Sequence, residues 1–448
     1  MKSTLITHST VVTLNPQGEV IKDGAVYVED GRIAWIGPVQ ELPPVQADEH
    51  VDAHDRIVLP GLINAHTHSA YYIMRGVGMD RNLLEWLQET VWPWLIEMDE
   101  KDVYLASMLG YVECIKSGTT ALIDNQNYPV YHKNHHDTVA QAALDSNLRV
   151  TLACGFSDVR FVSPPDFVDT PDEIEAEVSR MIDRWHGVDR LQVAVSPINI
   201  LYCSEEVIRR AVHVAQEKDV IIHTHVAESK EERDALLEHF GKGYLHVFHD
   251  LGALSPAFHS VHSVWLSDEE IELLGQARGT AVYNPTANML LASGIAPVRK
   301  LQEAGVNVAL GTDNPNNNND MLEAMKFGSL LQKVGGDPLA APAIDVLHMA
   351  TTHGARALGM EQEIGSLEVG KQADIILVDT LRPHNVPMHD PVATLVYSAQ
   401  GQDVTDVMVA GEILMRDSQI TFIAEHELLN EIQARSEALS ERVRAKRN

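Results

Sequence analysis

The sequence predicts an α/β protein in which a (β/α)8 TIM-like barrel is joined to a small composite β-sandwich domain built from both chain ends. The middle of the chain alternates short apolar runs with helical patterns, and eight such units favour a closed parallel barrel. Both ends read as short strands with tight turns. Because a barrel takes roughly 250 residues, the 448-residue chain has room for a second domain.

The two chain ends share a β-rich style. The segment GAVYVEDGRIAWIG places Asp30-Gly31 between two alternating stretches, which is typical of a type I′ hairpin. The same style returns after residue 365, as in GKQADIILVD. We expect residues 1–57 and 365–423 to pair into the β-sandwich domain, with the middle of the chain as an insertion.

Residues 58–364 are expected to form the barrel. A doubly wound open sheet is the alternative, but no GxGxxG motif follows the first strand. Residues 424–448 are expected to form a C-terminal helix, because apolar residues from Leu428 to Val443 keep helical spacing. The expected barrel strands are Arg56–Ile63, Thr119–Asp124, Arg149–Cys154, Leu191–Ser196, Val220–His225, Phe258–His262, Thr280–Asn284 and Val306–Gly311.

Composition narrows the class of partner. Asp and Glu (64) outnumber Lys and Arg (34), which gives a net charge of −30. Nucleic acids and anionic membranes bind basic surfaces, so neither is expected as a partner, whereas a neutral or cationic small molecule fits. The three cysteines form no CxxC, and the N-terminus lacks a signal-peptide pattern. No stretch approaches ~18 uninterrupted apolar residues, and we expect a cytoplasmic protein.

Metal-binding and acidic side chains stand at the ends of four expected strands. His66 and His68 follow the first strand, and residues i and i+2 of a strand point to the same face. The fifth, sixth and eighth strands are likewise followed by histidine or acidic residues. The C-terminal ends of barrel strands meet at one rim. The converging set is His66, His68, His225, Glu228, His262 and Asp313.

These residue types point to metal-assisted hydrolysis. Neutral imidazoles and one carboxylate suit Zn²⁺ or Fe²⁺, and such an ion can lower the pKa of bound water from 15.7 to about 7. One carboxyl group can then take a proton from the water while another protonates a ring nitrogen, and His262 could orient the water. His223, deeper in its strand, and His259 are interpreted as structural histidines.

The motifs resemble the amidohydrolase superfamily, in its aminohydrolase branch of S-adenosylhomocysteine/5′-methylthioadenosine deaminases, guanine deaminase and triazine hydrolases. The resemblance rests on LPGLINAHTH, HTHVAES, VHSVWLS, ALGTDN and ATTHGARALGMEQEIGSLEVGKQADIILVD, and covers nearly the whole chain. The resemblance implies one divalent metal ion, with zinc as the expected metal and iron as the alternative. The implied ligands are His66, His68, His225 and Asp313. The implied proton carriers are Glu228, His262 and Asp313, of which Asp313 takes the proton from water.

The segment GVGMDRNLLEWLQETVWPWL resembles the lid of the adenosine-type deaminases, in which Trp86 would flank the substrate. Three positions depart from that branch. Leu95 stands where those enzymes carry a glutamate that grips ribose, Ile198 replaces a histidine after strand four, and Tyr283 replaces another in strand seven. Losing buried polar partners weakens discrimination for a sugar. A free triazine, purine or pterin therefore becomes as good a candidate as an adenosine-type nucleoside.

We therefore predict a metal-dependent hydrolase of C–N bonds other than peptide bonds, a deaminase that attacks an amidine-like ring carbon of a small molecule. Trp86, Tyr283 and Asn316, in the loop up to Asn319, are candidate substrate contacts. Hydrolysis of a C–Cl, amide or urea bond at the same site is an alternative. Two alternatives from other classes are a catalytically silent assembly protein and a structural-metal protein, although a structural site needs no free acid nearby. A homodimer or higher homo-oligomer is expected.

Overall fold

A computed structural model describes residues 2–128, 134–313 and 318–447 of the chain. Its centre is a parallel barrel sheet in which the strands follow one another in chain order, from β6 to β13. The backbone N–H of Asp313 donates to the carbonyl of His66 (2.8 Å), and a parallel bridge joins Thr67 to Asp313, so the last strand returns to the first. The strands are β6 (Leu62–Thr67), β7 (Thr119–Asn127), β8 (Arg149–Phe156), β9 (Leu191–Pro197), β10 (Ile222–Val226), β11 (Phe258–His262), β12 (Thr280–Tyr283) and β13 (Asn307–Leu310).

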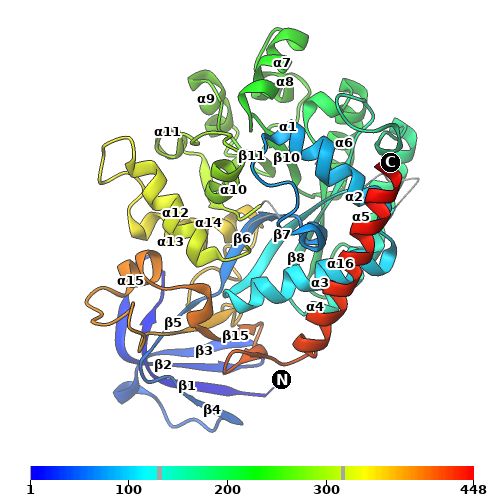
Figure 1. Cartoon of the computed structure of the whole chain (residues 1–448). Helices are drawn as coiled ribbons and strands as arrows, with labels where there is room; N and C mark the ends of the chain where they lie inside the picture. The colour runs from blue at the N-terminus through cyan, green and yellow to red at the C-terminus, as the bar shows by residue number, and fades with distance from the viewer. Residues whose placement is uncertain (1, 129–133, 314–317, 448) are drawn as a thin grey trace.

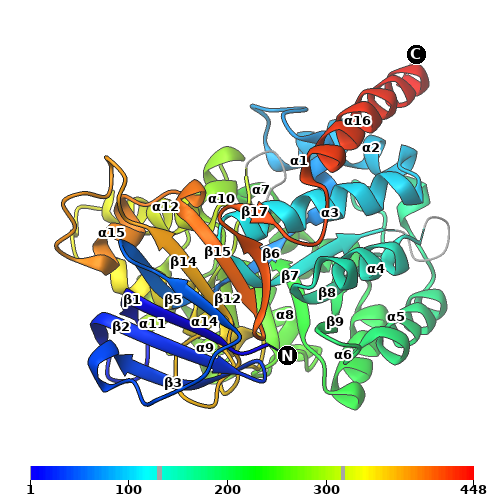
Figure 2. The ribbon, with the colours of Figure 1, turned by 90° about the horizontal axis from the view of Figure 1, so that it is seen from below.

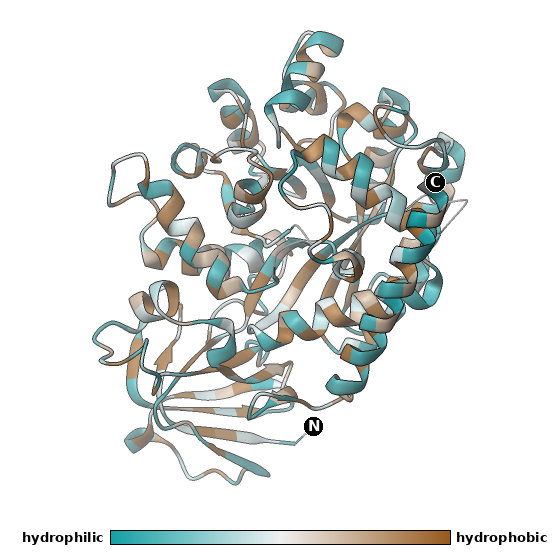
Figure 3. Ribbon diagram, viewed as in Figure 1, coloured by the Kyte–Doolittle hydropathy of each residue, from teal (hydrophilic) through white to brown (hydrophobic). Residues whose placement is uncertain are grey.

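Helices surround the barrel (Figure 1). The strands are buried on both faces, as parallel strands covered by helices must be, and their ribbons are mainly hydrophobic in Figure 3. The prediction of a barrel is therefore confirmed. The helices are α3 (Glu100–Lys116), α4 (His136–Ser146), α5 (Pro171–Trp185), α6 (Glu205–Lys218), α7 (Lys230–Phe240), α8 (Tyr244–Asp250), α9 (Asp268–Gln276), α10 (Pro285–Leu290), α11 (Val298–Glu303), α12 (Met321–Lys333), α13 (Ala343–Met349) and α14 (Thr352–Ala357).

A second, mixed sheet combines strands from the N-terminal part of the chain with strands from its C-terminal part. In Figure 2 the N-terminal strands β1 and β5 lie beside β14 and β15. Asp30 and Gly31 both have positive φ (50° and 79°), as the predicted hairpin between β2 and β3 requires. A bridge from Arg32 to Gln372 brings β3 back to the segment before β14. The strands are β1 (Thr4–Val12), β2 (Val20–Glu29), β3 (Arg32–Pro38), β4 (Glu49–Asp52), β5 (Arg56–Pro60), β14 (Ile375–Asp379), β15 (Val404–Val409), β16 (Glu412–Arg416) and β17 (Gln419–Ile420).

The expected first barrel strand, Arg56–Ile63, is in fact two strands. β5 pairs with β1 and β14 in the small sheet, whereas β6 starts the barrel. The chain passes between the sheets at Gly61, where a Cβ atom would lie 2.1 Å from the Thr120 side chain. Both strands are buried, so the apolar run continues across the break and hides it in the sequence.

The C-terminal helix α16 (Glu425–Arg447) packs along α3 and α2 (Trp92–Glu97). Two of its arginines bind Asp102, which is fully buried: Arg435 Nε lies 2.6 Å from Oδ1 and Arg442 Nη2 lies 2.5 Å from Oδ2. The Ser436 hydroxyl donates to the carbonyl of Ile73. The helix thus braces the segment that follows β6. None of the helices in the described ranges has the length and apolar character needed to cross a membrane.

Candidate active site

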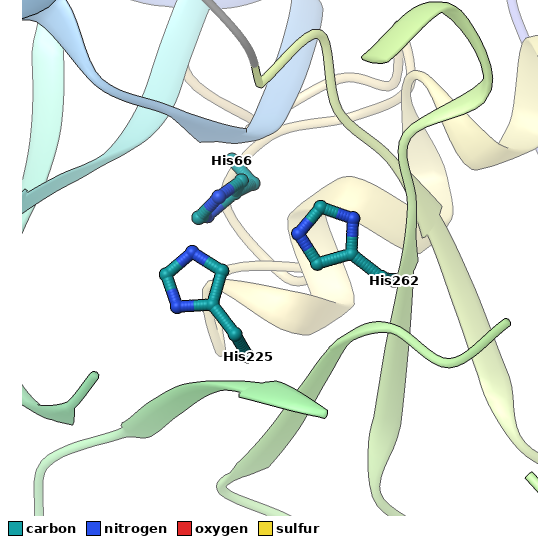
Figure 4. Close-up of side chains that lie close together, drawn as sticks. All are labelled: His66, His225 and His262. Atoms are coloured by element: carbon teal, nitrogen blue, oxygen red, sulfur yellow. The ribbon is translucent and has the colours of Figure 1, made fainter. Parts of the chain in front are cut away.

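The histidines predicted to meet at the barrel rim do meet there. Figure 4 shows the rings of His66, His225 and His262 turned toward one another from three strands, and potential ligand atoms of these three lie within 4.8 Å of each other. Asp313 joins them from the end of β13: its Oδ1 lies 3.1 Å from His66 Nε2 and 3.3 Å from His68 Nε2. The structure therefore brings the four expected ligand side chains and His262 to one point.

Backbone geometry at the strand ends aims these side chains. Ala227, His262 and Asp313 all have positive φ (50°, 71° and 58°), which is uncommon for residues other than glycine. Such strained conformations persist where the surrounding structure holds them, and they cluster at functional sites. Here they turn the chain at the C-terminal ends of β10, β11 and β13.

Hydrogen bonds to the far nitrogen of each imidazole set its orientation. His68 Nδ1 lies 2.6 Å from the carbonyl oxygen of Asn125, and His225 Nδ1 lies 2.7 Å from that of Ile198. A carbonyl accepts only, so Nδ1 must carry the proton, and Nε2 keeps a lone pair directed into the site. This is the arrangement by which histidine ligands are usually held.

The residues present fit a divalent metal. His66 Nε2 is buried and, although Asp313 Oδ1 lies 3.1 Å away, it makes no hydrogen bond of regular geometry within the described ranges, whereas buried polar atoms are normally paired. Three imidazole nitrogens and one carboxylate oxygen form a donor set that suits zinc or iron.

The carboxyl groups of the site differ in their acidity. Burial, reinforced by the charges of Glu232 and Asp313, raises the pKa of Glu228 well above its ordinary value, which favours the protonated form of this group. Burial opposes ionisation of Asp313, but the imidazoles of His66 and His262 outweigh it and hold the pKa of Asp313 well below its usual range. The site thus holds a carboxylic acid and a carboxylate side by side.

Burial favours the neutral form of three imidazoles of the site. Burial lowers the pKa of His66 to about 4 and lowers that of His225 well below its ordinary value. Burial also lowers the pKa of His262. His262 lies between the two carboxyl groups, with Nε2 3.3 Å from Glu228 and 3.7 Å from Asp313, while its Nδ1 lies 2.9 Å from Asn288 Oδ1. It is therefore placed to orient a molecule held between them.

His223 and His259 lie beneath the site. His223 Nε2 lies 2.8 Å from His66 Nδ1, and His223 Nδ1 lies 3.2 Å from His259 Nδ1. Both rings are buried. They form a hydrogen-bonded row of imidazoles below His66 that orients it, in agreement with the structural role expected for them.

A cavity opens above the site. One part of its lining carries the reactive groups described above. The remainder is largely apolar, with Asn127, Asn199, Tyr202 and Glu232 as the polar members. The apolar and aromatic part consists of Tyr71, Leu83, Trp86, Leu87, Ile198 and Leu291.

The three residues predicted to contact the substrate lie in different places. Trp86, at the end of α1 (Leu83–Trp86), lines the cavity, and its ring lies 6.4 Å from Tyr71, which in turn stacks on His68 at 4.7 Å. Asn316 lies outside the described residues. Asn319, at the end of the same loop, is buried and accepts hydrogen bonds from Thr67 and Thr312, so it braces the strand ends instead.

Tyr283 does not reach the cavity. Val282 packs with Val261 and Ala309 of the neighbouring strands, so the next side chain along β12 points to the opposite face. The Tyr283 hydroxyl accepts a hydrogen bond from Gln332 of α12 (3.1 Å). Strand alternation points to Asn284 instead, and its Nδ2 lies 3.4 Å from His262 Nδ1.

Two other positions bear on substrate choice. Ile198 lines the cavity, whereas Leu95 is buried in α2 and does not. Glu232 and Asn199 also line the cavity, although neither was predicted as a site residue. The sequence signal for Glu232 is its place four residues after Glu228, in the first turn of the helix that begins at Lys230.

Comparison with known proteins agrees with this geometry. A 5′-deoxyadenosine deaminase of Methanosarcina acetivorans is 39% identical over 99% of this chain and the whole of that protein. The crystal structure of an adenosine deaminase from Xanthomonas campestris with bound zinc is 30% identical and superposes with a TM-score of 0.91 over 99% of this chain and 98% of the other. A triazine hydrolase from Arthrobacter aurescens shares the fold at 22% identity, with a TM-score of 0.91 over 97% of this chain and 99% of the other.

The family assignment follows from the extent of these matches. Residues 57–414 match the sequence model of the amidohydrolase family. That range includes every strand of the barrel and all the residues of the site. The chain therefore belongs to the amidohydrolase family of metal-dependent hydrolases.

Proposed function

We propose that this protein is a hydrolytic deaminase that holds one divalent metal, with zinc preferred over iron, through His66, His68, His225 and Asp313. A single observation carries the proposal. The carboxyl groups of Glu228 and Asp313 lie 3.3 Å and 3.7 Å from His262 Nε2 at the end of a largely apolar cavity, and their pKa values are shifted in opposite directions, that of Glu228 upward and that of Asp313 downward. Deamination of a ring amidine needs such a pair, because one group must give a proton while another accepts one.

Each residue then has a definite part in the reaction. When held by these four residues, a divalent ion would act as a Lewis acid and could lower the pKa of water to about 7. Asp313 accepts the proton of the attacking water as its oxygen bonds to the ring carbon. Glu228 gives its proton to the adjacent ring nitrogen, and His262 keeps the water in line. The amino group leaves as ammonia after taking up the proton from Asp313, and the hydroxyl left on the ring carbon returns its proton to Glu228, so the carbon keeps the oxygen as a carbonyl.

The substrate that we propose is a flat, aminated nitrogen heterocycle, either free or as an adenosine-type nucleoside. The aromatic and aliphatic lining around Trp86, Tyr71 and Leu83 suits the faces of such a ring. The names of the relatives, 5′-deoxyadenosine deaminase and adenosine deaminase, support the nucleoside. Ile198, which lines the cavity and offers no polar group to a sugar, supports the free heterocycle.

The test is metal analysis coupled to an ammonia-release screen. Purified protein is assayed for metal content and incubated with adenosine, 5′-deoxyadenosine, guanine, pterins, cytosine and aminotriazines. We expect about one metal per chain and ammonia from one substrate class. One metal per chain without ammonia from any compound would exclude these deaminations and direct the search to C–Cl, amide or urea bonds. A metal-free protein would contradict the proposed site itself.

A further inference from the structure

Glu232 is a buried carboxyl group in the cavity wall that the proposed reaction does not use. Its side chain is 2% exposed and lines the same cavity as Glu228 and Asp313. Those two residues account for the proton transfers of deamination. A third acidic side chain therefore faces the substrate space without an assigned role.

The contacts of Glu232 leave one of its oxygen atoms free. Oε1 accepts a hydrogen bond from Asn199 Nδ2 at 3.3 Å. Oε2 is buried and has no hydrogen-bond partner among the residues that the structure describes. Burial raises the pKa of Glu232 to about 7, so a large share of the group is ionised at neutral pH. A buried carboxylate oxygen is costly to leave unpaired, which favours a ligand that donates to it.

Helix capping does not explain the position of Glu232. It is the third residue of α7, whose N-cap is Ser229, and its backbone N–H donates to the Ser229 hydroxyl (3.2 Å). In a complete capping box the acidic side chain at this position also accepts from the N-cap backbone N–H. Glu173 in α5 and Glu270 in α9 do so, at 2.9 Å and 3.0 Å. Glu232 does not complete a capping box: the backbone N–H and hydroxyl of Ser229 act on its carboxyl group and lower its pKa, but Oε2 keeps no partner in the described ranges, and the side chain lines the cavity.

We infer that Glu232, held by Asn199, binds a hydrogen-bond donor group of the substrate and thereby determines which heterocycles are accepted. The inference rests on the proposed function, in that the cavity is taken as the substrate site. The donors with the required chemistry are the hydroxyls of a ribose or the N–H groups of an amino-substituted ring. Ile198, beside Asn199 in the loop after β9, offers no such contact, whereas Glu232 on α7 supplies a carboxyl group to the same cavity.

The test compares substrates that differ only in donor groups. One pair is adenosine and 2′,3′-dideoxyadenosine, which differ in sugar hydroxyls. The other is 2,6-diaminopurine and adenine, which differ in a ring amino group. The measured quantity is the ratio of kcat/KM within each pair, for the wild-type protein, for Glu232→Gln, which keeps the shape of the side chain, and for Glu232→Leu, which removes both oxygens.

We expect Glu232→Gln to reduce the preference for the donor-bearing member of one pair about tenfold, because a hydrogen bond to a charged group is worth more than one to a neutral group. Glu232→Leu should reduce it further. The pair that responds identifies the donor as sugar or ring. The matched control is Glu231→Gln, which removes the same charge from an exposed neighbour in the same helical turn and should leave both ratios unchanged.

Equal loss for both members of each pair, or unchanged ratios, would overturn the inference, since a structural role lowers all substrates alike. Calorimetric dissociation constants of the same four compounds on the metal-loaded protein separate this outcome from failure of the proposed function. A shifted binding ratio without ammonia release would reject the deaminase and keep the role of Glu232. Ammonia release with unchanged ratios would do the reverse. No binding of any of the four compounds to the wild-type protein would reject both.

Discussion

The two walls of the cavity are built in different ways. The reactive wall stands on the ends of β6, β10 and β11 and on the residue that bridges back to β6. Its imidazoles are each fixed from behind by a carbonyl, an amide or another imidazole. The opposite wall consists of residues from the 3₁₀ segment Ser69–Met74, from the short helix Leu83–Trp86 and the π-helical turn Leu87–Val91, from the loop after β9, and from the first turn of α7, which carries Glu232.

This difference separates chemistry from recognition. Groups on strand ends of a closed barrel are held by the whole sheet, which gives the precision that a proton transfer needs. Side chains on short helices and loops can change without disturbing the barrel, as is usual for residues that set specificity. We therefore expect substitutions in the reactive wall to abolish turnover, and substitutions in the opposite wall to change which substrate is used and how tightly.

The largest expected effect is that of His68→Ala. Removing one of the three imidazole donors should release the metal, and turnover should fall by about 10³-fold or more, because the activated water is lost with it. Metal content and kcat are measured on the same preparation. An exposed histidine, His213→Ala, is the control, since it lies far from the rim on α6 and its side chain is 74% exposed. A metal-replete, active His68→Ala protein would show that the reactive wall is not a metal site.

The second prediction separates proton transfer from metal binding within the reactive wall. Glu228→Gln should keep the metal and lose about 10²–10³-fold in kcat, because general acid catalysis contributes effects of that size. In the wild-type protein, kcat should fall as the pH rises above the raised pKa of Glu228, since the protonated form is the active one. Metal analysis and a pH–rate profile check both points. Full activity of the metal-loaded variant would remove Glu228 from the proton transfer.

The reactive wall could be read from the sequence because strands impose a simple rule. His66, His68, His225 and His262 each close an apolar run, and such runs end at the same rim of a barrel. The sheets themselves were predictable for the same reason, apart from the break at Gly61. That break depends on the approach of Thr120, a residue 59 positions later, which no local pattern contains.

The opposite wall was harder to predict because its side-chain directions depend on tertiary packing. A motif comparison predicts Tyr283 in this wall, and only the alternation of β12 against its neighbours shows that it faces α12 and not the cavity. Glu232 looks like an ordinary residue in the first turn of a helix. Its direction follows from the contact with Asn199, which comes from a different part of the barrel. Sequence periodicity gives the face of an element but not the partner across a cavity.

A smaller effect is expected in the opposite wall. Trp86→Ala should raise KM about tenfold and change kcat little, because the indole covers the substrate space without touching the reactive groups, and one aromatic face contributes about 1.4 kcal/mol to binding. Trp86→Phe should recover most of the loss. Steady-state kinetics with the substrate found in the ammonia screen provide the measurement. A large fall in kcat with unchanged KM would mean that the two walls are not separate in function.

The smallest expected effect tests whether the neutral imidazoles of the reactive wall are special. His353, on α14 and away from the cavity, also has its pKa lowered to about 4, mainly by burial. Above pH 6.5 such a histidine is neutral in both folded and unfolded chains. Between pH 6.5 and 4 only the unfolded chain takes up the proton, so stability falls by at most about 1.4 kcal/mol per pH unit for each such group.

His353→Asn should make this loss shallower, because the amide can still donate to the carbonyl of Val308, which lies 3.2 Å from His353 Nδ1, but does not titrate. The free energy of urea unfolding of metal-free protein at pH 7 and pH 5 gives the slope, and His213→Asn, at an exposed position, should leave it unchanged. An unchanged slope in His353→Asn would mean that burial alone does not keep this histidine neutral. The low pKa values at the rim would then need a cause peculiar to the site. A shallower dependence of stability on pH would show that burial alone lowers the pKa of a histidine in this fold. The imidazoles of the reactive wall would then need no further cause for their low pKa values.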